Sequence, residues 1–300
     1  MRKIVSGIDA LMKNQGKSIK HENLKAFCHT YFHNTSAVAA MVVFILLVFL
    51  VVFAPAFTNY DPYEGTSAES LQTIGSENHI LGTDEQGRDL FTRCLYGGRI
   101  SLFMGFMPVI LATIVGGALG IISGYFGKMY ASIIMRTLDI FYAFPSIMLA
   151  IALSTVLGRG IISIILPIAI VLVPPIARVS ESVVQEIMSE EYMEAAQTSG
   201  AGHFKIIIKF VLPNVFGRIF IYCTTQFSVS LLSASALSFL GLGISPPTPE
   251  WGTMLNSLKQ QIFIQPTITI VPGIFIFLTA LSVNIMADGF KDAYNSIENL

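Results

Sequence analysis

Six stretches of this sequence are apolar over a length that can cross a lipid bilayer. They run over residues 37–57 and near residues 100–122, 131–157, 161–179, 216–240 and 268–289. A helix needs about 20 apolar residues to cross about 30 Å of hydrocarbon. Within lipid, only helices and closed barrels satisfy their backbone polar groups, and continuous apolar runs lack the alternation of barrel strands. The sequence therefore predicts an all-α polytopic membrane protein with six transmembrane helices.

Composition and the N-terminal end agree with this class. Of the 300 residues, 53% are hydrophobic and only 12% are charged, a balance too apolar for a normal solvated surface. The first apolar run is longer than the core of a cleaved signal peptide, and residues 1–36 form too long a polar leader for one. We therefore expect an uncleaved first helix. The net charge of -1 indicates no partner by itself, and we expect no nucleic acid to bind.

The distribution of lysine and arginine predicts how the spans are oriented. Thirteen of these residues fall in the N-terminal segment and in alternate loops: Arg2, Lys3, Lys13, Lys17, Lys20, Lys25, Lys128, Arg136, Arg178, Lys205, Lys209, Arg218 and Lys291. The opposite loops hold five: Arg88, Arg93, Arg99, Arg159 and Lys259. Because positive residues favour the cytoplasmic side, we expect residues 1–36, 180–215 and 291–300 in the cytoplasm and residues 58–99 outside it. This predicts a multi-pass membrane protein with both termini in the cytoplasm.

Small residues and prolines predict where the spans touch and bend. Three glycines recur at four-residue spacing in the second span: Gly116, Gly120 and Gly124. This spacing indicates a close helix contact rather than lipid exposure. Prolines interrupt other spans: Pro145, Pro167 and the pair Pro174-Pro175. Each removes a backbone donor, so the freed carbonyl must be met by neighbours or water. Bends that line a pathway and plain packing kinks both fit these prolines.

The cytoplasmic loop is expected to fold into helices around a glycine turn. From Glu181, apolar residues recur at helical spacing, so the fourth span should continue as an amphipathic helix. A short second helix should follow, because three carboxylates occupy its first turns, where the helix dipole favours them: Glu190, Glu191 and Glu194. Gly200 and Gly202 should reverse the chain. Residues 203–211 form another apolar segment, which we expect Pro213 to end.

This loop resembles the EAA motif of the permease subunits of ABC importers. The matching residues are Glu194-Ala195-Ala196, then Gly200, then Leu212-Pro213 at the family's spacing, with Phe210 in place of the usual isoleucine. The resemblance implies the type I ABC importer permease fold, with a five-helix core over residues 100–290. It also implies that residues 180–215 contain a coupling helix, which sits in a groove on the ATPase subunit.

The same resemblance implies how the loop would dock. Ala195 and Ala196 would allow close approach, and Gly200 would make the turn. Glu194 would supply a polar contact or a cap. The implied docking set is Glu194, Ala195, Ala196, Gly200, Ala201, Leu212 and Pro213.

Two further stretches are similar to one branch of these permeases. Residues 79–102, HILGTDEQGRDLFTRCLYGGRISL, look like the segment before the second span in the C-type subunit of the dipeptide, oligopeptide and nickel branch. Residues 236–255, ALSFLGLGISPPTPEWGTML, are similar to that branch's segment after the fifth span. The resemblance extends from about residue 37 to the C-terminus. It implies import of peptides by alternating access, with nickel or a metal-metallophore complex as the alternative cargo.

The complex implied by the resemblance supplies the ATP-binding site that this chain lacks. Gly16-Lys17-Ser18 has the end of a P-loop, but Leu11 stands where the first glycine belongs. We therefore expect no cofactor on this chain, with ATP and Mg bound by two separate ATPase subunits. The other implied partners are a second homologous permease subunit, an extracytoplasmic substrate-binding protein and membrane lipid. On this interpretation the chain is a transport subunit and not an enzyme.

Two other classes of function are disfavoured by the residues themselves. An ion-coupled carrier would normally need ionisable residues near mid-bilayer. Asp139, expected to pair with Arg136, and Asp288, near Lys291, both fall toward the ends of their spans. A membrane enzyme would need a catalytic or metal constellation, and the five histidines include no HExxH spacing. We expect no catalytic and no metal site, and substrate-contacting residues cannot be assigned from the sequence.

The extracytoplasmic segment is expected to be a solvated loop, with contact to a binding protein as the alternative. Its acidic residues are Asp61, Glu64, Glu69, Glu77, Asp84, Glu85 and Asp89. Trp251, the single tryptophan, is expected to anchor at the outer membrane interface. Cys28, Cys94 and Cys223 fit no metal or paired pattern, so we expect them to be unpaired and structural.

Overall fold

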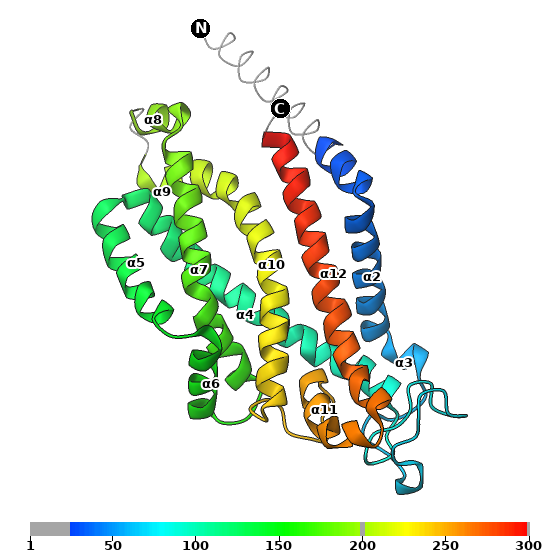
Figure 1. The fold of residues 1–300 in the computed structure, drawn as a ribbon. Coiled ribbons are helices and arrows are strands. Elements are labelled where there is room, and N and C mark those ends of the chain that lie inside the picture. The colour runs from blue at the N-terminus through cyan, green and yellow to red at the C-terminus, as the bar shows by residue number, and fades with distance from the viewer. Residues whose placement is uncertain (1–24, 199–201, 299–300) are drawn as a thin grey trace.

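The computed structural model describes residues 25–198 and 202–298, which are almost entirely helical. The helices, labelled in Figure 1, are α2 Thr35–Val52, α3 Ala54–Phe57, α4 Leu90–Phe126, α5 Lys128–Tyr142, α6 Ser146–Leu157, α7 Ile162–Met188, α8 Glu191–Thr198, α9 His203–Ile206, α10 Leu212–Phe239, α11 Trp251–Leu258 and α12 Pro266–Glu298. Short 3-10 helices cover Ser67–Glu69 and Lys259–Phe263, and a π-helical turn covers Ile207–Val211. Residues 1–24 of the predicted cytoplasmic segment lie outside the described residues.

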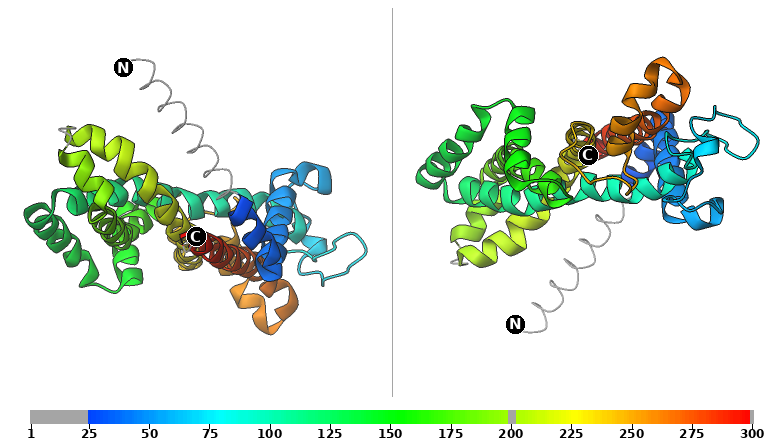
Figure 2. Two further views of the ribbon diagram at one scale, coloured as in Figure 1. Left: turned by 90° about the horizontal axis from the view of Figure 1, so that it is seen from above. Right: turned by 90° about the horizontal axis from the view of Figure 1, so that it is seen from below.

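The long helix α4 organises the molecule. Seen from above and below, it runs from the α2–α12 pair to the group formed by α5, α6 and α7 (Figure 2). The helix α8 and the C-terminal end of α12 lie at one end of the spans, and α11 with residues 58–89 lies at the other (Figure 1). The predicted docking loop and the predicted extracytoplasmic segment therefore lie at opposite ends of the molecule.

Five helices of the described chain are long and apolar enough to cross a membrane: α2, α4, α7, the continuous helix over residues 203–239, and α12. The predicted third span, residues 131–157, differs from one straight helix. It is the pair α5 and α6, bent by 84° at residues 143–145. Pro145 explains the break, because proline cannot donate a backbone hydrogen bond and restricts the residue before it. The expected six spans are present only if this pair counts as one.

The glycine stripe on α4 packs against α7. A Cβ added at Gly116 would lie 2.7 Å from the Val173 carbonyl oxygen, and one at Gly124 would lie 2.7 Å from Val184 Cβ. At Gly120, the added Cβ would lie within 3.0 Å of the Ala177 carbonyl oxygen. The predicted helix contact is therefore confirmed, and the absence of side chains lets the two backbones touch.

The prolines of α7 have different effects at different positions along the helix. Pro167 cannot donate to the Ser163 carbonyl, and the Ser154 hydroxyl of α6 donates to that carbonyl instead. The prediction that a neighbouring group meets the freed carbonyl is therefore confirmed at Pro167, and this hydrogen bond links α6 to α7. The helix passes through Pro174 and Pro175 without a break.

The expectation that Pro213 would end a helix is wrong. The segment from His203 continues through the proline into α10. The turn before the proline, Ile207–Val211, is π-helical. A π turn is wider than an α turn, so it relieves the clash of the proline ring with the preceding turn and accommodates the missing donor.

The segment predicted to be extracytoplasmic contains buried charges, so the expected solvated loop is wrong for Asp84 and Asp89. Asp84 Oδ2 lies 2.7 Å from Arg88 Nε and 3.2 Å from Arg93 Nε, and all three side chains are at most 5% exposed. His79 Nδ1 lies 2.9 Å from Asp89 Oδ1. Asp89 also accepts from the Thr92 amide at 2.7 Å and so caps α4. Helix α4 therefore begins at Leu90, inside the range 58–99 expected to precede the core.

Trp251 is not an interfacial anchor. Its side chain is fully buried, and its indole nitrogen donates to the Cys94 carbonyl at 2.8 Å. The preceding Glu250 is buried too. Its carboxylate accepts from the Gly252 and Thr253 amides at 2.9 and 2.8 Å and from the Ser101 hydroxyl at 3.0 Å. These contacts fix α11 on the N-terminal part of α4 as part of the folded core.

Replacement of Asp84 by asparagine should strongly destabilise the protein, because it removes the carboxylate shared by two buried guanidinium groups and leaves Arg88 only its longer contact of 3.8 Å with Glu85. Removing one partner of a buried ion pair typically costs about 3–5 kcal/mol. Thermal unfolding of the purified protein would measure the loss. The matched control is Glu77→Gln in the same segment, where the side chain is exposed and the change should stay within about 0.5 kcal/mol. Equal unfolding of both variants would contradict the structural role of the network.

Candidate functional site

The candidate docking loop is helix α8 and its connections to α7 and α9. As predicted, α7 continues as one helix to Met188, and α8 follows after a two-residue link. Met193 and Ala196, three residues apart on α8, are buried. Met193 is fully buried in an apolar cluster with Val184, Ile187 and Ile206. Sequence reasoning missed this anchor, although its helical spacing to Ala196 is the signal that could have found it.

Polar contacts tie the loop to three spans. Arg218 of α10 donates to Glu186 of α7 at 2.6 Å. The Tyr125 hydroxyl at the end of α4 lies 2.8 Å from His203 Nδ1. Two residues earlier on α4, the Ser123 hydroxyl donates to Glu181 of α7 at 2.6 Å. These contacts join α4, α7, α9 and α10 around the base of α8, while α8 itself packs on α7 through Met193.

Tyr192 lies where α8 meets the start of α10. The Asn214 side-chain amide donates to its hydroxyl at 3.4 Å and to the Phe210 carbonyl at 2.7 Å. Burial raises the pKa of the Tyr192 phenol, and the nearby Glu190 carboxylate adds to the rise. The phenol therefore stays neutral and able to act as a hydrogen-bond donor.

The outward face of α8 carries only part of the predicted docking set. Glu194 and Ala195 are exposed, whereas Ala196 is 9% exposed and faces its own chain. Gly200 and Ala201 lie outside the described residues. Leu212 and Pro213 are exposed at the start of α10, one helix further along the chain. The exposed surface of α8 also includes Glu191, Tyr192, Gln197 and Thr198.

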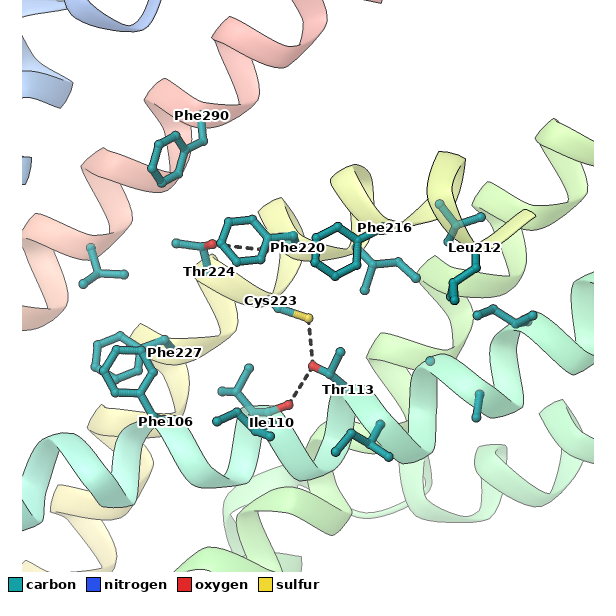
Figure 3. A pocket seen from close by; sticks show the side chains of 18 of the residues that line it. Phe106, Ile110, Thr113, Leu212, Phe216, Phe220, Cys223, Thr224, Phe227 and Phe290 are labelled. Atoms are coloured by element: carbon teal, nitrogen blue, oxygen red, sulfur yellow. Dashed lines mark hydrogen bonds between the residues drawn. The ribbon is translucent and has the colours of Figure 1, made fainter. Parts of the chain in front are cut away.

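The larger pocket, about 730 Å³, lies between α4, α10 and α12 (Figure 3). Phenylalanines from three helices face it: Phe106, Phe216, Phe220, Phe227 and Phe290. The Thr113 hydroxyl donates to its own helix at Val109, at 2.6 Å, and the Thr224 hydroxyl donates to Phe220, at 3.0 Å. These hydroxyl protons are already used, so the pocket fits an apolar occupant and not a charged peptide.

The ionisable residues of the spans are arranged differently from the expectation. Asp139 of α5 pairs with Arg178 of α7 and not with Arg136. The bend after α5 places the side of α5 that carries Asp139 next to α7. Asp288 is exposed on α12. Within residues 25–198 and 202–298, no three side chains of histidine, cysteine, aspartate or glutamate gather as metal ligands. The three cysteines are free thiols.

Comparison with protein families gives two matches that together cover most of the chain. Residues 116–295 match the binding-protein-dependent transport system inner membrane component family. Residues 24–73 match the N-terminal transmembrane domain of oligopeptide transport permease C. The first match contains the candidate docking loop, and the second contains the first span.

Curated relatives agree over nearly their full length. A di/tripeptide transport system permease protein of Pseudomonas aeruginosa is 38% identical over 90% of this chain and 91% of its own. A dipeptide transport system permease protein of Alkalihalophilus pseudofirmus is 40% identical over 87% and 85%. A glutathione transport system permease protein of Pectobacterium atrosepticum is 35% identical over 90% and 89%.

A solved structure shares the fold. The inward-facing methionine ABC transporter MetNI aligns with a TM-score of 0.54 and 20% identity, over 68% of this chain and 95% of that one. The helical architecture is therefore the one expected for an ABC importer permease. The chain belongs to the family of binding-protein-dependent transport system inner membrane components, as a permease subunit of the type found in oligopeptide permease C.

Proposed function

We propose that this chain is one of two permease subunits of a bacterial importer that moves di- or oligopeptides into the cytoplasm by alternating access. The relatives named for dipeptides and di/tripeptides support the cargo class. A relative named for glutathione, itself a tripeptide, supports the same class. The relatives above carry no name for nickel, which leaves that alternative cargo without support.

The main observation behind the proposed mechanism is that α8 is exposed on one face and buried on the other. Its outward face, including Glu194 and Ala195, is exposed, while Met193 on the opposite face is fully buried. A short helix exposed on one side and anchored on the other is suited to fit into a groove on a partner. The ATPase subunit is that partner in this proposal, and ATP and Mg bind there. Closure of the ATPases then moves α8, and the packing of Met193 on α7 together with the Asn214–Tyr192 contact to α10 passes the motion to the spans.

The proposed orientation places α8 and both termini in the cytoplasm. Residues 58–89 and α11, at the opposite end of the spans, then face the periplasm or exterior (Figure 1). In that segment Asp61, Glu64 and Glu77 are exposed above the buried ion network. We assign this acidic surface to contact with the substrate-binding protein, which delivers the cargo.

Transport by the assembled complex tests the proposed function. The permease pair, the ATPases and the binding protein would be reconstituted in liposomes, and uptake of a labelled dipeptide, of glutathione and of Ni²⁺ would be compared. We expect ATP-dependent accumulation of the dipeptide or of glutathione. Accumulation of Ni²⁺ alone, or uptake that persists without ATP, would contradict the proposal.

A further inference from the structure

A second, smaller pocket lies where the bent pair α5–α6 meets α7 and α10. Its volume is about 270 Å³, just below the range of about 300–1,000 Å³ typical of small-molecule sites. Unlike the large pocket, its lining includes the side chains of Tyr142, Ser146, Gln226 and Ser233 among apolar residues. These polar groups give the pocket hydrogen-bonding partners for a polar occupant, which the large pocket lacks.

The proline pair of α7 adds a hydrogen-bond acceptor to this pocket. Pro174 and Pro175 both line it, together with Val171. Because Pro175 has no N–H, the Val171 carbonyl loses the donor that an α-helix normally supplies from four residues ahead. An unmet carbonyl in apolar surroundings is costly, so an N–H group from an occupant would be bound favourably there.

The opposite wall presents an amide. Gln226 of α10 lines the pocket, and the Tyr222 phenol hydrogen-bonds to its side chain. A glutamine amide both donates and accepts, so it can pair with the N–H and the C=O of a peptide unit. The Ser233 hydroxyl lies further along the same wall.

A charged pair adjoins the pocket. The Arg178 guanidinium lies 4.5 Å from the centre of the Tyr142 ring, which lines the pocket, and it pairs with Asp139. The side chains of Arg178 and Asp139 are 48% and 51% exposed, so each can exchange its partner. A short peptide carries the complementary charges, an ammonium group at one end and a carboxylate at the other.

We propose that this pocket is a transit site for the peptide backbone during import, an inference that rests on the proposed peptide transport. The Val171 carbonyl and the Gln226 amide bind a peptide unit, and the Asp139–Arg178 pair opens to meet the charged ends. Recognition of the backbone, and not of side chains, lets cargo of varied sequence pass. The large apolar pocket has no part in this step.

Replacement of Gln226 by leucine tests the site, because it keeps the approximate size of the side chain and removes the amide. In the reconstituted complex, uptake of two dipeptides with different side chains should fall by about tenfold each, the effect of about one lost hydrogen bond. ATP hydrolysis stimulated by the binding protein should stay near wild type. Thr224→Val is the matched control, since that hydroxyl bonds only within α10 and lines the other pocket.

The outcomes separate this inference from the proposed function. If the wild-type complex imports no peptide, the proposed function fails. If the wild type imports peptide and Gln226→Leu matches it, the transit site is wrong. A loss for one dipeptide only would also overturn backbone recognition. If the complex with Gln226→Leu does not assemble, Ser233→Ala is the second test. A several-fold reduction in peptide uptake would support the transit site, and unchanged uptake would reject it.

Discussion

Replacement of Gly120 by alanine should cost the protein several kcal/mol and prevent stable assembly. The added Cβ would lie within 3.0 Å of the Ala177 carbonyl oxygen, 2.5 Å from Ser180 Cβ and 3.0 Å from the Glu181 amide nitrogen. Two of these atoms belong to the backbone of α7, so no rotamer change can make room. The helices must separate, and overpacking of this kind typically costs about 1–3 kcal/mol or more. Thermal unfolding and the yield of folded protein would measure the loss.

Gly117→Ala is the matched control on the same helix. A Cβ at Gly117 would meet no atom within 4 Å, because this position faces the large pocket. Alanine favours a helix over glycine by about 1 kcal/mol, so this variant should be neutral or slightly more stable. A stability loss of equal size in both variants would show that the backbone contact between α4 and α7 does not account for the effect.

The sequence predicts well those features that depend on residues near one another in the chain. The glycine spacing on α4 identifies its contact with α7, since four-residue spacing alone places the glycines on one face. The amphipathic extension of α7 and the short helix α8 follow from local periodicity in the same way. The number of spans follows from length and hydropathy, except that the bend at Pro145 divides the third.

Features that depend on distant residues are not encoded in local patterns. Trp251 is buried because its indole reaches the Cys94 carbonyl, 157 positions away in the sequence. Asp139 has Arg136 one turn before it, but the bend between α5 and α6 favours Arg178 of another helix. The acidic residues of the extracytoplasmic segment looked solvated because hydropathy treats each charge alone, whereas Asp84 is buried as part of a network.

The predicted docking residues show what local sequence patterns can predict and what they cannot. The motif locates the loop, but only the fold shows that Ala195 points outward and Ala196 inward. Met193, which anchors the helix, is absent from the motif set although it is the most deeply buried of these residues. The motif thus predicts where a partner would bind, and the packing determines which of its residues remain exposed for contact.

Replacement of Ala195 by tryptophan should abolish coupling to the ATPase while leaving the permease folded. The Ala195 side chain is exposed on α8, so a large substituent has room to project away from the described residues. If α8 sits in a groove of the ATPase, the indole must displace it, and disruption at the centre of an interface commonly costs about 2 kcal/mol or more, at least about thirtyfold in affinity. Copurification of the ATPase and uptake of peptide should both fall sharply, with the amount of permease in the membrane unchanged.

Ala68→Trp provides the matched control for this experiment. Ala68 is also exposed, but on the 3-10 helix Ser67–Glu69 at the opposite end of the molecule. It should leave copurification of the ATPase at the wild-type level. Glu194→Lys gives an independent test on α8, because reversing an exposed charge leaves the buried face of the helix intact. If both α8 variants retained the ATPase and transported peptide at the wild-type rate, the docking role of α8 would be rejected, and the ATPase would have to bind another cytoplasmic surface.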